Sequence, residues 1–221
     1  MKRYLLAAIG ALLIVPASAA QAQVCIGMGS MAAAPMNLRL GVEFGNDVKS
    51  YGARFGFGSS IMFAGVSGSI LDPDGSDETA KTIGIDGGLS YVVGTARNVV
   101  VCPIAELSYT MFPDVEVLGE EYGASVTTGG AGLAVGASMR AGATMTLIPF
   151  AALQGVYSRF DFDVPGTDED SDSETYGLLS GGLSFALTEA VLLRPIINIP
   201  LGLDNADPTY GVSIAFAFGR R

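Results

Sequence analysis

Eight charged or amide side chains interrupt stretches that otherwise alternate large apolar residues with small ones. Counted by parity within each stretch, all eight fall on the face opposite the large apolar residues. They are Arg39, Glu43, Arg54, Asp86, Glu106, Gln154, Arg194 and Asn198. Three cations and three anions in a narrow interior must pair or meet water, because an unpaired buried charge is costly. Two interpretations stay open: a polar network that plugs the interior, and a charged constriction that lines a small pore.

Two acidic segments are candidates for binding a divalent cation. Residues 161–174 carry seven carboxylates and residues 72–78 carry four. Calcium takes many oxygen ligands, so either segment could hold an ion or bridge through one to lipid phosphates. Neither has the spacing of an EF-hand loop. A solvated acidic loop is the favoured interpretation, with divalent cations kept as candidate partners and no metal site predicted.

Enzymatic chemistry has little support in the composition. The chain contains no histidine, so a serine nucleophile would need a lysine or carboxylate as its activator. We therefore expect no catalytic residues, no enzyme activity and no cofactor. The formal net charge of −10 argues against a nucleic acid as partner.

The beginning of the chain is typical of an exported protein. A cationic start, a short apolar stretch and a small-residue cleavage site predict a signal peptide over residues 1–22. Export leads to an oxidising compartment, where a disulfide is permitted. We predict a bond between Cys25 and Cys102 that pins residues 23–35 under or inside the mouth of the folded domain. Two free thiols, with Cys102 as a small interior residue, are the alternative.

The elements that must position these side chains are β-strands. Residues 210–218 alternate large apolar and small residues, and a second face that is merely small leaves the apolar face to meet lipid. The same pattern recurs, with strand lengths suited to crossing a bilayer. Ten strands are predicted, with eight as the alternative: 37–44, 51–57, 61–71, 81–93, 98–110, 125–139, 144–160, 176–187, 190–201 and 209–218.

The connections between these strands fall into two alternating classes. Tight turns alternate with longer acidic loops, and 18 of the 22 acidic residues lie in the longer class. Short turns on one rim and long loops on the other are typical of an up-and-down transmembrane barrel. We predict an all-β, antiparallel, membrane-spanning barrel over residues 37–221, preceded by an N-terminal periplasmic segment over residues 23–36.

The pattern resembles that of small single-domain outer-membrane β-barrel proteins of Gram-negative-type bacteria. The family's C-terminal assembly signal is a glycine, a hydrophobic residue three positions on and aromatics at alternate positions. Gly211, Ile214, Phe216 and Phe218 match it. The usual terminal aromatic is here followed by Gly219 and two arginines. The resemblance implies outer-membrane lipid and the barrel-insertion machinery as partners, with both termini in the periplasm.

Three roles are compatible with this sequence. A structural or surface-exposed barrel with a largely plugged polar lumen is the leading prediction. A narrow, porin-like passive channel for ions or small solutes is the second. Binding of a ligand or partner through the acidic extracellular loops is the third.

Overall fold

The computed structural model describes residues 24–26, 36–59, 61–75, 78–93, 99–117, 120–141, 145–163, 170–188, 190–203 and 206–219. The predicted signal peptide, residues 1–22, lies outside these ranges. So does most of the predicted periplasmic segment, residues 23–36. Ten strands form a closed antiparallel barrel, so the predicted fold class is confirmed. The eight-stranded alternative is wrong. No helix in the described ranges is long and apolar enough to span a bilayer.

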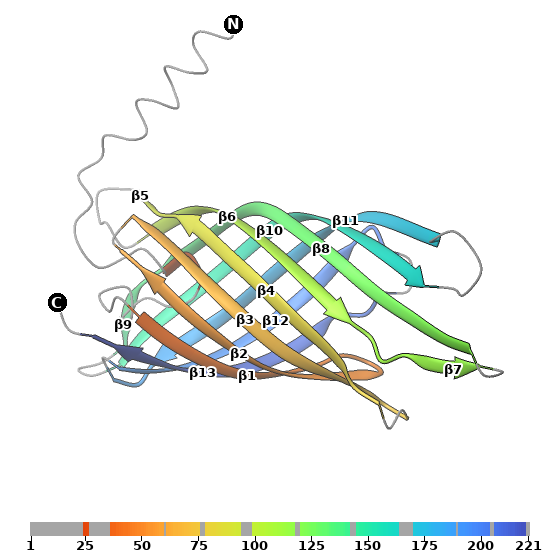
Figure 1. Ribbon diagram of the computed structural model, residues 1–221. Helices are drawn as coiled ribbons and strands as arrows, with labels where there is room; N and C mark the ends of the chain where they lie inside the picture. The colour runs from red at the N-terminus through yellow and green to blue at the C-terminus, as the bar shows by residue number, and fades with distance from the viewer. Residues whose placement is uncertain are drawn as a thin grey trace, which may run out of the picture.

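The ten barrel strands follow the chain order, each pairing with its neighbours (Figure 1). The ring closes where the first strand pairs with the last, as Met36 lies opposite Phe218. The strands are β1 (Met36–Phe44), β2 (Val48–Gly58), β3 (Met62–Pro73), β4 (Ala80–Leu89), β6 (Val99–Met111), β8 (Glu120–Ala137), β10 (Met145–Asp163), β11 (Asp170–Ala186), β12 (Val191–Leu201) and β13 (Thr209–Phe218).

Three short strands and one turn complete the described structure. They are β5 (Tyr91–Val93), β7 (Val115–Val117), β9 (Met139–Ala141) and the 3-10 turn η1 (Val24–Ile26). The predicted strand 81–93 is thus interrupted at Ser90, and the predicted strand 125–139 is interrupted between β8 and β9. The last strand has the predicted bounds.

The acidic connections differ from the prediction. Residues 111–124 were predicted to be a loop, but β7 pairs with the start of β8 there. Likewise β10 runs to Asp163 and β11 begins at Asp170, so much of the acidic segment 161–174 is strand. Polar residues can continue a hairpin because backbone hydrogen bonds between the two strands hold it together. Residues 164–169 lie outside the described ranges.

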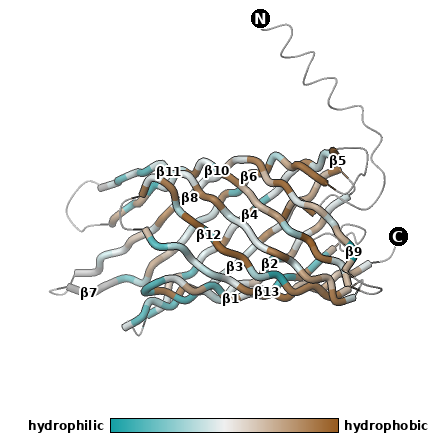
Figure 2. The backbone as a smooth tube through the Cα atoms, turned by 180° about the vertical axis from the view of Figure 1, so that it is seen from behind, coloured by the Kyte–Doolittle hydropathy of each residue, from teal (hydrophilic) through white to brown (hydrophobic). Residues whose placement is uncertain are grey.

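The barrel wall is taller on one side. β8, β10 and β11 contain 18, 19 and 17 residues, whereas β1 contains nine and β13 ten. A tilted strand of ~9–11 residues suffices to cross a bilayer. The extra length lies at the end of the barrel that carries β7, where hydrophilic residues gather (Figure 2). Hydrophobic residues gather toward the opposite end, near β5 and β9.

Large apolar side chains point outward along the wall. Ile83, Leu133 and Leu153 are 59%, 59% and 55% exposed, although each sits in the middle part of its strand. The alternate positions point inward, and the buried apolar cluster of the molecule lies inside the ring near β5 and β9. The outer face is therefore apolar and the inner face is mixed.

Candidate functional site: the lumen cavity and its plug

The eight residues singled out from the sequence line one cavity inside the barrel. Its volume is about 420 Å³, and its lining includes Arg39, Glu43, Arg54, Asp86, Glu106, Gln154, Arg194 and Asn198. Apolar side chains reach the same space, notably Ile104, Phe150 and Ile196. At ten strands, a barrel interior is wide enough to leave such a space between side chains.

Among the described residues, one salt bridge joins two side chains that line the cavity, Arg54 and Asp86. Arg54 Nε and Nη2 donate to the two carboxylate oxygens at 2.6 and 2.5 Å, which makes the pair bidentate. The strand between them, β3, contributes Gly65 directly opposite Asp86. A Cβ on Gly65 would overlap the guanidinium. Glycine on β3 therefore clears the path for a salt bridge that spans three strands.

A second network links four neighbouring strands, β1, β13, β12 and β11. Thr209 and Asn198 both donate to Glu43 Oε1, Asn198 at 2.7 Å. Ser180 donates in turn to Asn198 Oδ1 at 2.7 Å. In the described part of the chain, the hydrogen bonds to this lumen carboxylate thus come from neutral donors. Ser180 and Thr209 were not singled out from the sequence, although their inward parity in β11 and β13 would have identified them.

Two threonines offer a test of how much this network contributes. We expect Thr209→Val to lower the free energy of unfolding by about 1.5–3 kcal/mol, because Glu43 loses a donor to its charge. Thr128 makes a neutral bond, with its hydroxyl 3.2 Å from that of Ser158. Thr128→Val is the matched control, with an expected loss of about 0.5–1.5 kcal/mol. Urea unfolding in detergent micelles measures both, and equal losses would contradict a charge-assisted role for Thr209.

The remaining lumen charges have different surroundings. Gln154 donates a hydrogen bond to the Glu106 carboxylate, and both side chains lie over Gly130. Arg194 is 8% exposed, and its guanidinium carbon lies 4.4 Å from the centroid of the Phe150 ring. Arg39 lines the cavity beside Arg54, its direct cross-strand neighbour.

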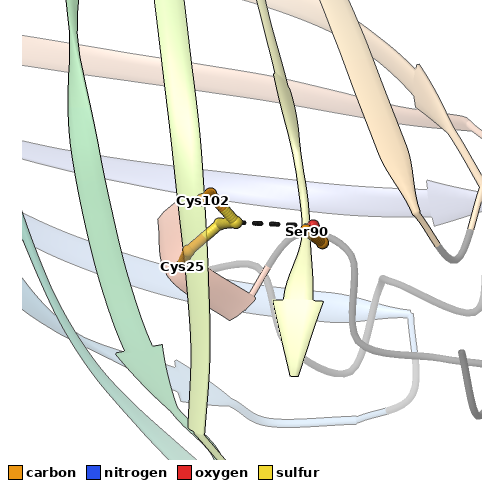
Figure 3. The surroundings of a disulfide bond; sticks show 3 residues. All are labelled: Cys25, Ser90 and Cys102. Carbon is orange, nitrogen blue, oxygen red and sulfur yellow. Dashed lines mark hydrogen bonds between the residues drawn. A yellow bond between two sulfur atoms is a disulfide. The ribbon is translucent and has the colours of Figure 1, made fainter. Parts of the chain in front are cut away.

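A plug closes the end of the lumen near β5 and β9. It is the turn η1, which lies inside the ring and is bonded to β6 through the Cys25–Cys102 disulfide (Figure 3). The predicted disulfide is confirmed. Neither cysteine has any exposed surface, and the Ser90 hydroxyl lies 3.4 Å from Cys102 Sγ. Val24 of η1 belongs to the same buried apolar cluster, together with side chains from seven strands: Phe63, Val100, Ala134, Ile148, Ala186, Leu192 and Ala215.

Two more contacts hold the plug in place. Arg194 Nε donates to the Ile26 carbonyl oxygen at 3.0 Å, which satisfies a backbone group inside the barrel. On β8, a Cβ on Gly136 would overlap the carbonyl group of Val24. The backbones of η1 and β8 thus meet directly. No local pattern in the sequence indicates this contact between residues 24 and 136.

The other candidate features are the predicted assembly signal on β13 and the two acidic segments. On β13, Ile214 and Phe218 are exposed on the outer face, and Gly211 lines the cavity. Together with Phe216 they remain a predicted assembly signal. No group of three or more potential metal ligands comes together in the described ranges. Both acidic segments are described only in part, since residues 76–77 and 164–169 fall outside those ranges.

No protein-family model matches the chain, and no curated protein matches its sequence. Among solved structures, the N-terminal β-barrel domain of Pseudomonas aeruginosa OprF is 13% identical, with 83% of this chain and 96% of that one covered and a TM-score of 0.39. Ail of Yersinia pestis is 12% identical, with 83% and 96% covered and a TM-score of 0.46. The translocator domain of the Neisseria meningitidis autotransporter NalP is 10% identical, with 83% and 87% covered and a TM-score of 0.48.

Proposed function

We propose that this protein is an outer-membrane β-barrel with a structural or surface-exposed role, whose lumen is closed by its own N-terminal segment. The outward apolar face is the observation that carries this proposal. In water, each exposed Leu, Ile or Phe side chain would forgo about 1.5–3 kcal/mol of burial. Lipid removes this cost, and a closed barrel is one of the two folds that satisfy every backbone group in a bilayer.

The orientation follows from the connections. β1 begins and β13 ends on the rim that carries the plug. Transmembrane barrels of the outer membrane place short turns in the periplasm and longer loops outside. We therefore assign the plugged rim to the periplasm and the acidic hairpins to the cell surface. The oxidising periplasm suits the disulfide.

The interior supports a closed lumen more than a passive channel. The plug fills the periplasmic end with apolar groups and removes Cys25, Cys102 and Val24 from solvent almost completely. The polar cavity lies above it, and its floor includes Cys25 and Ile26. An ion that crossed the barrel would have to pass this apolar floor without water. We propose no enzymatic role.

Planar-bilayer recording tests the closed lumen. The full-length protein is expected to give no conductance steps. Deletion of residues 23–35 together with Cys102→Ala is expected to give stable steps, because the apolar floor is gone. The matched control is the full-length Cys25→Ala/Cys102→Ala variant, which keeps the plug and lacks only the bond. We expect it to stay closed most of the time.

Two results would overturn parts of the proposal. Steady conductance of the full-length protein, altered by Glu106→Gln, would favour the narrow channel. Failure to insert into lipid vesicles, with no mobility difference between unheated and boiled samples on a detergent gel, would remove the membrane-spanning barrel itself.

A further inference from the structure

Two arginines of the lumen cavity form no salt bridge with a carboxylate in the described ranges. In the part of the chain that the structure describes, the ion pairs are Lys49–Asp74, Arg54–Asp86 and Arg159–Asp161. Arg39 and Arg194 are in none of them. Only one Arg194 nitrogen, Nε, donates a hydrogen bond, and it goes to a backbone carbonyl in the plug. The cavity therefore holds guanidinium donors that no described side chain uses.

These two cations lie on one wall of the barrel. Arg39 is on β1 and Arg194 is on β12, with β13 between them. On β13, Ala215 lies opposite Arg39 and Ser213 lies opposite Arg194. Both β13 residues are small, so neither places a bulky side chain between the two arginines. The arrangement presents two guanidinium groups to the same space.

An anion lies on the facing wall. Going around the ring from β13, five steps in either direction lead to β6, which places β6 diametrically opposite. β6 carries Glu106, which lines the same cavity and is hydrogen bonded by Gln154 on β10. Its direct cross-strand partner is Asp86, whose charge is already used by Arg54. Glu106 therefore has an amide partner and forms no salt bridge with a cation within the described ranges.

We propose that this cavity binds a small zwitterion of the free amino acid type. The carboxylate of the ligand accepts hydrogen bonds from Arg39 and Arg194, and its ammonium group faces Glu106. Guanidinium groups match carboxylates in geometry, and such charge-assisted bonds are roughly twice as strong as neutral ones. A volume of about 420 Å³ is in the range of ligand pockets. This binding site goes beyond the proposed function and rests on one part of it, the lumen closed by the plug.

The charge balance favours a zwitterion over a simple anion or cation. The lining holds three arginines against Asp86, Glu43 and Glu106, so its formal charges cancel. A ligand with a net charge would leave an uncompensated charge in a confined space, which is costly. A zwitterion supplies the missing partner to each wall and leaves the sum unchanged. The plug forms the floor, so the ligand enters from the surface side and does not cross.

Isothermal titration calorimetry on the full chain in detergent tests this site, with L-alanine as the probe. Acetate and methylammonium each carry one of its two charges and serve as half-ligands. We expect L-alanine to bind at least about tenfold more tightly than either half-ligand, because one charge-assisted contact is lost in each case. Arg39→Met and Glu106→Gln are each expected to weaken L-alanine binding by about tenfold or more.

The matched control is Lys49→Gln, which removes a cation whose partner, Asp74, lies on the exposed rim. It should leave L-alanine binding unchanged. Gel mobility of unheated and boiled samples verifies that each variant is folded. Equal affinity for acetate and L-alanine, or no heat of binding with folded protein, would overturn the proposal. Neither result bears on conductance, so failure here is distinguishable from failure of the proposed function.

Discussion

Gly136→Val is expected to expel the plug from the barrel. The backbone of β8 at Gly136 touches the carbonyl group of Val24, so any side chain there occupies the seat of η1. With η1 displaced, Cys25 no longer lies beside Cys102 and the disulfide cannot form. Loss of a bond that spans 77 residues costs about 4–5 kcal/mol in the chain-entropy model. The apolar contacts around η1 are lost in addition.

Thiol labelling under denaturing, non-reducing conditions measures this effect. The original protein should take up no maleimide and the variant two. Gly155→Val is the control, because a Cβ on Gly155 meets nothing within 4 Å and the residue lies on the adjacent strand β10. It should stay unlabelled. Full oxidation of Gly136→Val, with no conductance, would show that η1 does not occupy this seat.

Asp86→Ala is expected to give the second large effect. Arg54 is 4% exposed, and without Asp86 its charge stays in the lumen with no anion bound to it. Breaking a buried pair by removing one partner costs about 3–5 kcal/mol. We expect a loss near 3 kcal/mol, the lower end, because the neighbouring cavity admits water.

Replacing both partners should restore most of the stability. The double variant Arg54→Met/Asp86→Leu fills the space with apolar groups. Its free energy of unfolding is expected to lie within about 1 kcal/mol of the value for the original protein. Asp74→Ala, which breaks the exposed pair with Lys49, is the control and should cost no more than about 1 kcal/mol. Urea unfolding in micelles gives all three values. A double variant as unstable as Asp86→Ala would contradict an uncompensated charge as the cause.

The barrel strands can be predicted from the local sequence pattern. Large apolar residues at every second position gave ten strands, and for β13 the predicted and observed bounds agree. The disulfide could be predicted without knowing the strand register, because the chain has only two cysteines. The hairpin extensions of β10 and β11 were missed because their polar residues have no apolar alternation to mark them as strand. Backbone pairing between β10 and β11 continues through these extensions.

The candidate site shows the same division. Parity within a strand assigns each polar residue to a face, and that requires only local sequence. Which carboxylate receives which arginine depends on register across several strands, as Arg54 on β2 reaches over β3 to Asp86 on β4. The seat of η1 depends on a glycine more than a hundred positions away, and nothing near either residue signals the contact.

The uneven height of the wall has a consequence for approach from outside. The tall arc of β8, β10 and β11 carries carboxylates such as Asp161, Asp172 and Glu174 above the rim of the short strands. Their potential extends about 8–10 Å at ordinary ionic strength. Dissolved anions are repelled by these carboxylates before they reach the interior of the barrel, whereas neutral molecules experience little electrostatic force. Discrimination by charge thus begins in the solvent, and raising the salt concentration should weaken it.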